Sequence, residues 1–257
     1  MAIEFYKYQG TGNDFIIVDN RNDKFPKNNT KLIAHMCDRK FGIGADGLIL
    51  LENHDTADFN MVYYNSDGNL SSMCGNGGRC ITHFAKFLGI IENQAVFEAI
   101  DGMHESSVDA ETISLRMNDV NSLQVNGASI YLNTGSPHHV TLVDDLTVFD
   151  VFNEGKRIRT SIYGEEGANV NFVEKVSESV FAVRTYERGV EDETLSCGTG
   201  VTAVALAMHE TMNTTSEEIT LKTPGGELKV RFIKTENGYT DIYLIGPAIQ
   251  VFKGIWE

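Results

Sequence analysis

Apolar and polar positions alternate along most of this chain, which predicts many short strands. Helical spacing is confined to residues 30–40 and to two stretches that follow Cys74 and Cys197; the first of these two ends at Gly89. The run Val201–Met208 is apolar on nearly all sides, so its helix is predicted to be the more deeply buried. Strands are expected at residues 3–8, 15–18, 48–51, 59–64, 95–100, 107–109, 112–117, 128–133, 139–143, 158–163, 169–176, 182–186, 218–223, 227–233, 239–244 and 249–252. Strands dominate without regular alternation with helices, which favours an α+β fold.

Both long helical stretches begin in the same way. Cys74-Gly75-Asn76-Gly77 and Cys197-Gly198-Thr199-Gly200 share a Cys-Gly-x-Gly pattern, 123 positions apart. The same offset superimposes Thr11-Gly12-Asn13 on Thr134-Gly135-Ser136, Gly44-Ala45-Asp46 on Gly167-Ala168-Asn169, Tyr64-Asn65 on Glu187-Arg188, and Gly102 on Gly225. One offset that aligns several landmarks in order predicts an internal duplication.

The duplication predicts two pseudo-symmetric domains, each a curved, mainly antiparallel sheet wrapped around a central helix. We expect a first domain of residues 1–117 plus a C-terminal strand, 248–257, and a second of residues 118–247. The tail after Pro247 has no counterpart at the end of the first copy, and we therefore expect it to cross back onto the first domain. The active site is expected in the cleft between the domains.

Composition narrows the class of protein. A formal charge of −15 over 257 residues argues against nucleic acid or an anionic membrane as a partner. No signal peptide and no apolar run of about 18 residues is visible, so the cytoplasm is the expected location. Four cysteines without a C-x-x-C pair favour neither a disulfide framework nor a zinc site. Cys37, within the first helical stretch, is interpreted as core.

The stretch Gly42–Gly47 matches the G-x-G-x-x-G pattern of dinucleotide-binding turns. That motif requires a strand before it and a helix after it. Here a predicted helix precedes and the strand-like run 48–51 follows, so we reject a dinucleotide site.

The two cysteines are the strongest candidates for chemistry. A cysteine at a helix N-terminus is favoured as thiolate, and the N–H groups there bind anions. Two equivalent thiols suit a reaction that removes a proton from one face of a carbon and adds one to the other. Backbone N–H groups of Gly75-Asn76 and Gly198-Thr199 would stabilise the charge that develops on a substrate carboxylate. A redox pair that cycles through a disulfide and a catalytically silent anion-binding module are the alternatives; neither explains a thiol in both copies.

Seven motifs together resemble the diaminopimelate epimerase family. They are Gly12-Asn13-Asp14-Phe15, Gly42–Gly47, Asn65-Ser66-Asp67-Gly68, Cys74–Cys80, Pro137-His138, Glu187-Arg188-Gly189 and Cys197–Gly200, within a match from Phe5 to Gly254. The resemblance implies interconversion of LL- and meso-diaminopimelate in lysine and cell-wall precursor synthesis, without pyridoxal phosphate or a metal, by a homodimer. Proline racemases share the two-thiol fold, so the fold alone does not fix the substrate.

The resemblance also implies roles for individual residues. Cys74 and Cys197 would be the acid and base, assisted by His138 and Glu187, and the helix starts Gly75-Asn76 and Gly198-Thr199 would hold the reacting carboxylate. The remaining substrate contacts would come from Asn13, Asn65, Asn169, Glu187 and Arg188, with Arg188 suited to the distal carboxylate. Two departures stand out: Ser136 replaces the usual Asn before Pro-His, and the segment 189–196 is one residue longer than usual.

Overall fold

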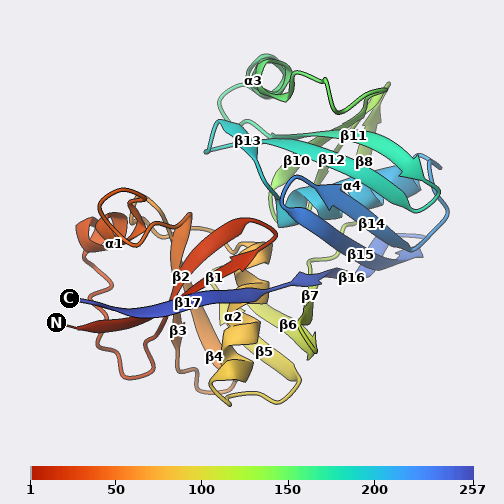
Figure 1. Cartoon of the computed structure of the whole chain (residues 1–257). Helices are drawn as coiled ribbons and strands as arrows, with labels where there is room; N and C mark the ends of the chain where they lie inside the picture. The colour runs from red at the N-terminus through yellow and green to blue at the C-terminus, as the bar shows by residue number, and fades with distance from the viewer. Residues whose placement is uncertain (1) are drawn as a thin grey trace. The chain divides into compact units, whose positions relative to one another are not determined.

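The computed structural model describes residues 2–257, which divide into two compact units (Figure 1). Unit 1 comprises Met1–Leu115 and Gly246–Glu257, and unit 2 comprises Arg116–Ile245. The elements of the first part of the chain are β1 (Ile3–Gly10), β2 (Asn13–Asp19), α1 (Thr30–Cys37), β3 (Gly47–Glu52), β4 (Phe59–Asn65), α2 (Gly75–Phe87), β5 (Gln94–Ala99), β6 (Gly102–Asp109) and β7 (Thr112–Arg116). They are followed by β8 (Leu123–Asn126), β9 (Ser129–Asn133), β10 (Pro137–Leu142), α3 (Val151–Ser161), β11 (Asn169–Ser177), β12 (Val180–Glu187), β13 (Asp192–Thr194), α4 (Gly198–Glu210), β14 (Glu218–Thr223), β15 (Gly226–Thr235), β16 (Gly238–Pro247) and β17 (Ile249–Trp256).

The strand pairing of unit 1 follows a simple order. β1 to β6 pair in sequence, with antiparallel, parallel, antiparallel, parallel and antiparallel ladders in turn. The last strand of the chain, β17, pairs antiparallel with β1, as Figure 1 shows. Helix α2 contacts β1, β2, β3 and β6, and its fully buried Ile81 and Phe84 contribute to the core.

Unit 2 repeats this order. β9, β10, β11, β12, β14 and β15 pair with the same alternation of antiparallel and parallel ladders. Helix α4 contacts strands β9 to β12, β14 and β15, and every residue of Val201–Met208 is buried. In α2 the last residue, Phe87, is about half exposed. The predicted α+β fold with an internal duplication, and the deeper burial of the second helix, are confirmed.

The two copies differ at their first hairpin. In unit 1 the closing pair is Gly10 with Asn13, whereas in unit 2 it is Asn133 with Pro137. The second turn therefore contains one more residue, Ser136. The constant offset of 123 does not describe the strand register at this turn.

The strand expected at residues 158–163 is wrong, because helix α3 covers Val151–Ser161. The side chain of Asp150 caps this helix by accepting from the N–H of Asn153. Val151 and Ile158 are buried at helical spacing, whereas the expectation was based on the last residues of the helix alone. The short strands β8 and β13 were not expected from the sequence.

Candidate active site

Cys74 and Cys197 occupy the N-cap positions of α2 and α4. Their backbone angles are nearly the same, with φ −111° and ψ 123° for Cys74 and φ −122° and ψ 114° for Cys197. Neither side chain makes a capping hydrogen bond, whereas the caps of α1 and α3 in the described residues 2–257 both accept one. Each thiol therefore lies at the positive end of a helix dipole, which favours the thiolate.

The first turn of each of these helices presents backbone N–H groups to a ligand. The first helical hydrogen bonds run from the N–H of Gly78 to Cys74 C=O and from the N–H of Val201 to Cys197 C=O. The N–H groups of the residues between each cysteine and that donor lie ahead of the helical ladder. They include the N–H groups that the sequence predicts for a substrate carboxylate, those of Gly75, Asn76, Gly198 and Thr199.

Close packing explains the glycine in this turn. A Cβ added to Gly200 would lie 2.6 Å from Asn171 Oδ1 and 3.3 Å from Cys197 Sγ. A Cβ at Gly77 would lie 3.1 Å from Ile49 Cδ1. A larger residue at position 200 would displace either the hydrogen-bonded amide of Asn171 or the helix start, whereas at position 77 the neighbouring side chain would have to shift by a few tenths of an ångström.

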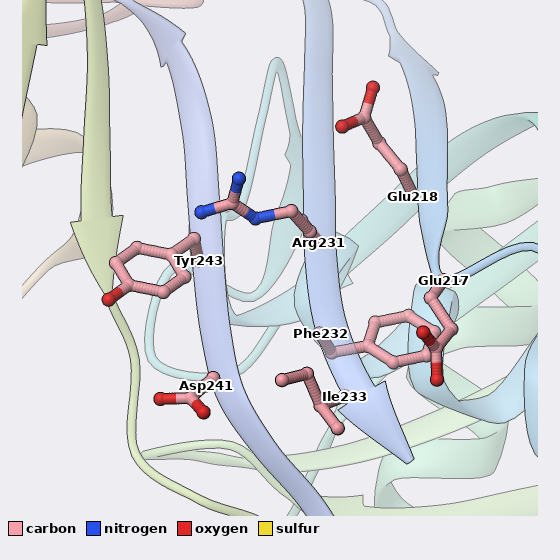
Figure 2. A pocket seen from close by; sticks show the side chains of 7 residues that line it. All are labelled: Glu217, Glu218, Arg231, Phe232, Ile233, Asp241 and Tyr243. Carbon is pink, nitrogen blue, oxygen red and sulfur yellow. The ribbon is translucent and has the colours of Figure 1, made fainter.

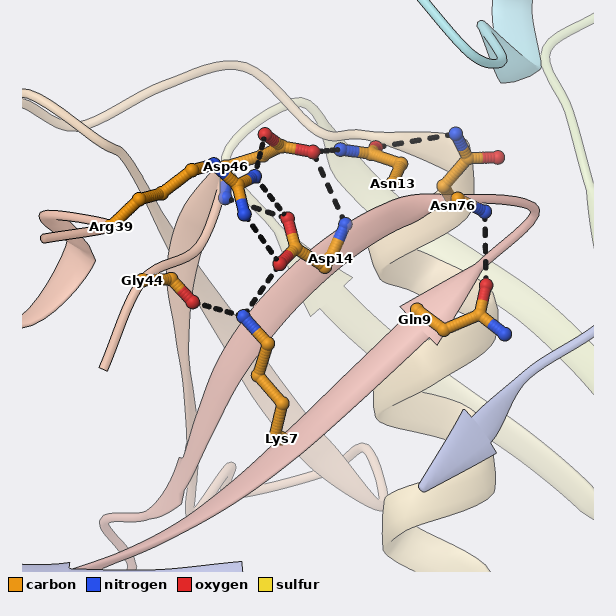
Figure 3. A network of polar contacts seen from close by, with 9 residues as sticks. Lys7, Gln9, Asn13, Asp14, Arg39, Gly44, Asp46 and Asn76 are labelled. Atoms are coloured by element: carbon orange, nitrogen blue, oxygen red, sulfur yellow. Dashed lines mark hydrogen bonds and ion pairs between the residues drawn. The ribbon is translucent and has the colours of Figure 1, made fainter. Parts of the chain in front are cut away.

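In unit 1 the structure brings Cys74, Asn13 and Asn76 together. Asn13 Oδ1 accepts from Cys74 Sγ at 3.5 Å and from Asn76 Nδ2 at 3.2 Å, as Figure 3 shows for the two asparagines. Asn13 Nδ2 donates to Asp46 Oδ2 at 2.7 Å, which fixes the orientation of the amide. Asn65, at the end of β4, is exposed and forms the turn to Asn69.

Behind Asn13 lies an ion-pair network that was not predicted from the sequence (Figure 3). Asp14 accepts from Lys7 at 2.6 Å and from Nη1 and Nη2 of Arg39, and Arg39 also donates to Asp46 at 2.7 Å. Burial alone would raise the pKa of Asp14, but the bonds from Arg39 and Lys7 lower it to about 2. The acids of this network occur in the Asn13 and Gly42–Gly47 motifs, but their cationic partners, Lys7 and Arg39, lie outside these motifs and carry no local signal.

In unit 2 a hydrogen-bonded chain leads to Cys197. His138 is fully buried, and burial, followed by the charge of Arg188, lowers its pKa to about 3, so the ring is neutral. Asn171 Nδ2 lies 3.2 Å from His138 Nδ1, while Asn171 Oδ1 accepts from Thr185 and fixes the amide. Asn169 Nδ2 also lies 3.5 Å from His138 Nε2, but the contact at Nδ1 is the shorter of the two, so we assign Nδ1 as the acceptor and the proton to Nε2. Nε2 donates to Thr199 Oγ1 at 2.9 Å, which leaves the Thr199 hydroxyl to donate to Cys197 Sγ at 3.4 Å.

The other predicted residues of unit 2 lie around the end of β12. Buried Asn169 donates to Ser136 Oγ at 3.0 Å and accepts from the backbone N–H of Arg188 at 2.9 Å. The Arg188 side chain is exposed and donates to the carbonyl of Glu166. Glu187 accepts from the Thr194 hydroxyl at 2.9 Å. Ser136 thus contacts a predicted binding residue directly.

The other cysteines belong to the core. Cys37 and Cys80 are buried free thiols, and burial raises the pKa of each to about 12. The interpretation of Cys37 as a packed residue is confirmed. Residues 2–257 contain no group of three or more His, Cys, Asp or Glu side chains that could hold a metal ion. No helix in the same range has the length and apolar character needed to cross a membrane.

A hollow of about 450 Å³ lies on strands β15 and β16 of unit 2 (Figure 2). The guanidinium of Arg231 lies over the ring of Tyr243, 5.0 Å from its centre. The other residues that line this hollow are Glu217, Glu218, Phe232, Ile233 and Asp241. None of them is a predicted site residue, so the candidate site remains the pair of cysteine helix starts.

Comparison with known proteins identifies the family. The family model described as diaminopimelate epimerase matches residues 5–122 and 130–251. The diaminopimelate epimerase of Flavobacterium psychrophilum is 57% identical over 253 residues, covering 98% of this chain and 99% of the relative. That of Chlorobaculum tepidum is 43% identical over 256 residues, covering 95% and 98%.

Solved structures share the fold at low identity. A Bacillus anthracis phenazine biosynthesis protein of the PhzF family superimposes with a TM-score of 0.81 at 14% identity, covering 100% of this chain and 99% of the other. A hydroxyproline epimerase from Agrobacterium vitis, with bound trans-4-hydroxy-L-proline, gives a TM-score of 0.67 at 12% identity, covering 99% and 92%. These likenesses show the fold alone, whereas the family model and the close relatives show the family. The chain belongs to the diaminopimelate epimerase family.

Proposed function

We propose that this chain is an amino-acid epimerase that interconverts LL-2,6-diaminopimelate and meso-diaminopimelate without a cofactor, in lysine and peptidoglycan precursor synthesis. The observation that carries the proposal is the pair of cysteines at equivalent, uncapped helix N-termini in a chain of this family. Neither the redox pair nor the silent anion-binding module accounts for both features.

Cys74 and Cys197 divide the proton transfer between them. One sulfur, as thiolate, takes the proton from the α-carbon and becomes a thiol, while the electron pair moves into the substrate carboxylate as an enediolate. The other sulfur, as thiol, gives its proton to the opposite face of the carbon and becomes the thiolate. The roles are exchanged in the reverse reaction. One substrate carbon must be reached by both thiols, so we propose that the substrate binds in a cleft between the two units.

The helix starts stabilise the enediolate. N–H groups of Gly75 and Asn76 in one copy, and of Gly198 and Thr199 in the other, donate to the carboxylate oxygens as negative charge develops on them. Such donors cost no reorganisation during the reaction, because the helices hold them in place. Asn13, held by Asp46, provides a further contact to the reacting end of the substrate.

The groups that hydrogen-bond towards Cys197 Sγ are polar but uncharged. His138 reaches the sulfur through the Thr199 hydroxyl, and this chain of donors favours the thiolate of Cys197. In this proposal Glu187 assists the proton transfer at Cys197 Sγ. At the distal end, Arg188, Asn65 and Asn169 bind the second amino-acid head, and Arg188 pairs with its carboxylate.

The test is incubation of the purified chain with LL-diaminopimelate in deuterated water without added cofactor. We expect the meso isomer to form with deuterium at one α-carbon, and Cys74→Ala and Cys197→Ala each to lose at least about 10²-fold in turnover. Proline and lysine serve as controls and should not react. Racemisation of proline at a comparable rate, or normal turnover by either cysteine variant, would contradict the proposal.

We also propose that the enzyme is a cytoplasmic homodimer, as the family resemblance implies. Light scattering on the purified chain should give twice the mass of 28.4 kDa. A monomeric mass at assay concentration would contradict this assembly without affecting the chemistry.

A further inference from the structure

The amide of Asn13 is held in one orientation by Asp46. Asn13 begins β2 and Asp46 directly precedes β3, and the parallel pairing of these strands brings the two residues together. Asp46 Oδ2 accepts from Asn13 Nδ2 at 2.7 Å, and Asp46 Oδ1 accepts from Arg39 Nη2 at 2.7 Å (Figure 3). Since an ionised carboxylate only accepts hydrogen bonds, the amide nitrogen of Asn13 must face Asp46 and the amide oxygen must face away from it.

That amide oxygen faces Cys74. Asn13 Oδ1 lies 3.5 Å from Cys74 Sγ and accepts from Asn76 Nδ2 at 3.2 Å. A carbonyl oxygen accepts a hydrogen bond from a thiol but repels a thiolate. The orientation that Asp46 imposes on Asn13 therefore favours the protonated form of Cys74.

The second copy reverses the polarity of this contact. Asn169 stands at the position equivalent to Asp46, by the offset of 123, and pairs with His138 in the parallel ladder of β10 and β11. A neutral amide thus replaces the carboxylate. His138 Nε2 donates to the Thr199 hydroxyl, which donates to Cys197 Sγ. A donor at the sulfur stabilises its charged form, so this contact favours the thiolate of Cys197.

The charges near the start of α2 do not account for this difference. Lys7 on β1 pairs with Asp14 on β2, and Arg39 pairs with Asp14 and Asp46, so that two cations offset two acids. The helix dipole acts on both sulfurs alike, because both cysteines are N-caps with nearly the same backbone angles. Other titratable groups near this helix are the buried, protonated Tyr8 and Cys80, His83, which lies 3.2 Å from the Tyr8 hydroxyl, and His104, which pairs with Asp101.

Arg79, within α2, acts in the opposite direction. It is fully buried, and its hydrogen bonds run to the Thr11 hydroxyl and to the carbonyl of Pro247. Its positive charge favours a thiolate at Cys74. Because this charge is the same in every variant at position 46, a comparison of such variants isolates the effect of the Asn13 amide.

The elements packed around Cys197 add no net charge that opposes the bond from Thr199. His138 on β10 is neutral, and Glu187 and Arg188, of opposite sign, are neighbours at the end of β12. The buried side chains of β9, β14 and β15, which also contact α4, are all apolar.

We propose that Asp46 is a positioning residue: it holds the carbonyl of Asn13 against Cys74, which keeps Cys74 protonated in the ligand-free enzyme and leaves Cys197 as the resting thiolate. The resting form then reacts with Cys197 as the base, which takes the α-proton, while the Cys74 thiol gives its proton to the opposite face. Proton exchange with water afterwards restores the resting pair. This inference rests on the proposed two-thiol function.

The experiment measures the pH dependence of alkylation at each cysteine separately. The full-length wild type and its variants are treated with iodoacetamide between about pH 5 and 10, and peptides containing Cys74 and Cys197 are quantified by mass spectrometry at low extent of labelling. Asp46→Leu removes the acceptor that orients Asn13 and keeps a branched side chain of similar size. Asp46→Asn removes the same charge but retains an acceptor for the Asn13 amide. Arg39→Met disturbs the ion pairs and leaves the bond between Asn13 and Asp46 in place.

In the wild type we expect the alkylation midpoint of Cys197 to lie below that of Cys74 by about one pH unit or more. In Asp46→Leu the Cys74 midpoint should fall by about one unit, which raises its thiolate fraction about tenfold below the midpoint, while the Cys197 midpoint stays in place. Asp46→Asn should keep the Cys74 midpoint of the wild type, and Arg39→Met should not lower it. The alkaline limb of kcat/KM for diaminopimelate reports the thiol that must be protonated, so it should fall with the Cys74 midpoint in Asp46→Leu.

Three results would overturn the inference. A Cys74 midpoint at or below that of Cys197 in the wild type would place the resting thiolate on Cys74. Equal falls in Asp46→Leu and Asp46→Asn would assign the effect to the charge of Asp46 and not to the orientation of Asn13. An unchanged Cys74 midpoint in folded Asp46→Leu would leave Asp46 without this role. Should Asp46→Leu not fold, Asp46→Ala is tested by the same criterion.

Two further variants complete the test. Asn13→Ala removes the carbonyl itself, so that adding Asp46→Leu should cause no further shift at Cys74; a further shift would contradict an action through Asn13. Cys74→Ala separates the two levels of the proposal. If Cys74→Ala still epimerises the substrate, the proposed two-thiol function fails; if it is inactive while Asp46→Leu leaves the Cys74 profile unchanged, only the role of Asp46 fails.

Discussion

Thr199→Val tests the hydrogen-bonded chain at Cys197. Valine has nearly the shape of threonine but lacks the hydroxyl that lies between His138 Nε2, at 2.9 Å, and Cys197 Sγ, at 3.4 Å. The backbone N–H of residue 199, which the proposal assigns to the substrate carboxylate, is retained. The substitution therefore removes one donor from the sulfur and one acceptor from the histidine.

The magnitude follows from these two losses. The protonated Nε2 of fully buried His138 is left without its acceptor, which costs about 1–3 kcal/mol. Loss of the donor to the sulfur raises the pKa of Cys197, since a hydrogen bond to the charged form favours that form. The unpaired Nε2 lowers the stability of the fold, whereas the lost hydrogen bond to the charged sulfur is worth about 1.5–3 kcal/mol. At about 1.4 kcal/mol per factor of ten, we therefore expect kcat/KM for diaminopimelate to fall about 10- to 100-fold.

The assay follows epimerisation and the alkylation profile of Cys197 in parallel. Thr199→Ser retains the hydroxyl and should remain close to the wild type. Thr202→Val removes a buried hydroxyl that bonds only within the helix, and serves as the control for a Thr-to-Val change in α4. The assigned hydrogen-bond chain from His138 through Thr199 to Cys197 would be refuted if Thr199→Val had the kcat/KM of the wild type and the same pH dependence of Cys197 alkylation.

Three further outcomes are expected. Gly200→Ala should lower turnover at least about tenfold and stability by about 1–3 kcal/mol, because its Cβ would lie 2.6 Å from Asn171 Oδ1; activity assays and thermal melts check this. In the folded protein the pKa of Asp14 is about 2, below its unfolded value, so the stability that its ionised form contributes is present above about pH 4 and is lost as the pH falls towards 2. Denaturant titrations across that range should show the free energy of unfolding falling by up to about 2 kcal/mol, and Asp14→Asn should abolish this dependence on pH. Mild oxidation should inactivate the enzyme reversibly by linking Cys74 to Cys197, and peptide mapping that finds no such cross-link in the inactive protein would count against two thiols that share one carbon.

Most of the fold could be predicted because its signals are local or repeated. Alternation marked most of the strands, and the repeated Cys-Gly-x-Gly pattern marked both central helices and the duplication. Helix α3 was missed because its apolar face is narrow: Val151, Gly155 and Ile158 are its only buried residues in the structure. The extra residue in the second hairpin was missed because a constant sequence offset aligns the residues of the two copies but gives no information on the length of each turn.

The candidate site could be proposed from the sequence only where a single motif contains the groups. Each thiol and the N–H groups after it lie within a few residues of each other, so their spacing marks them as candidates. The support of Asn13 by Asp46, and the pairing of Asp14 with Lys7 and Arg39, join residues from separate elements. Contacts of this kind depend on how the chain folds, and no periodic pattern in the sequence indicates them.

Burial divides the candidate site into two kinds of residue. The helix starts are mostly buried and are repeated in both copies, and under the proposed function they serve the α-carbon of the substrate and its carboxylate. Asn65 and Arg188 are exposed and lie at the ends of β4 and β12, where loop length can change without disturbing the core. Under the proposed function these exposed ends select the second amino-acid head of the substrate. A protein of this fold can then change its substrate through these loops while the two buried helix starts remain the same.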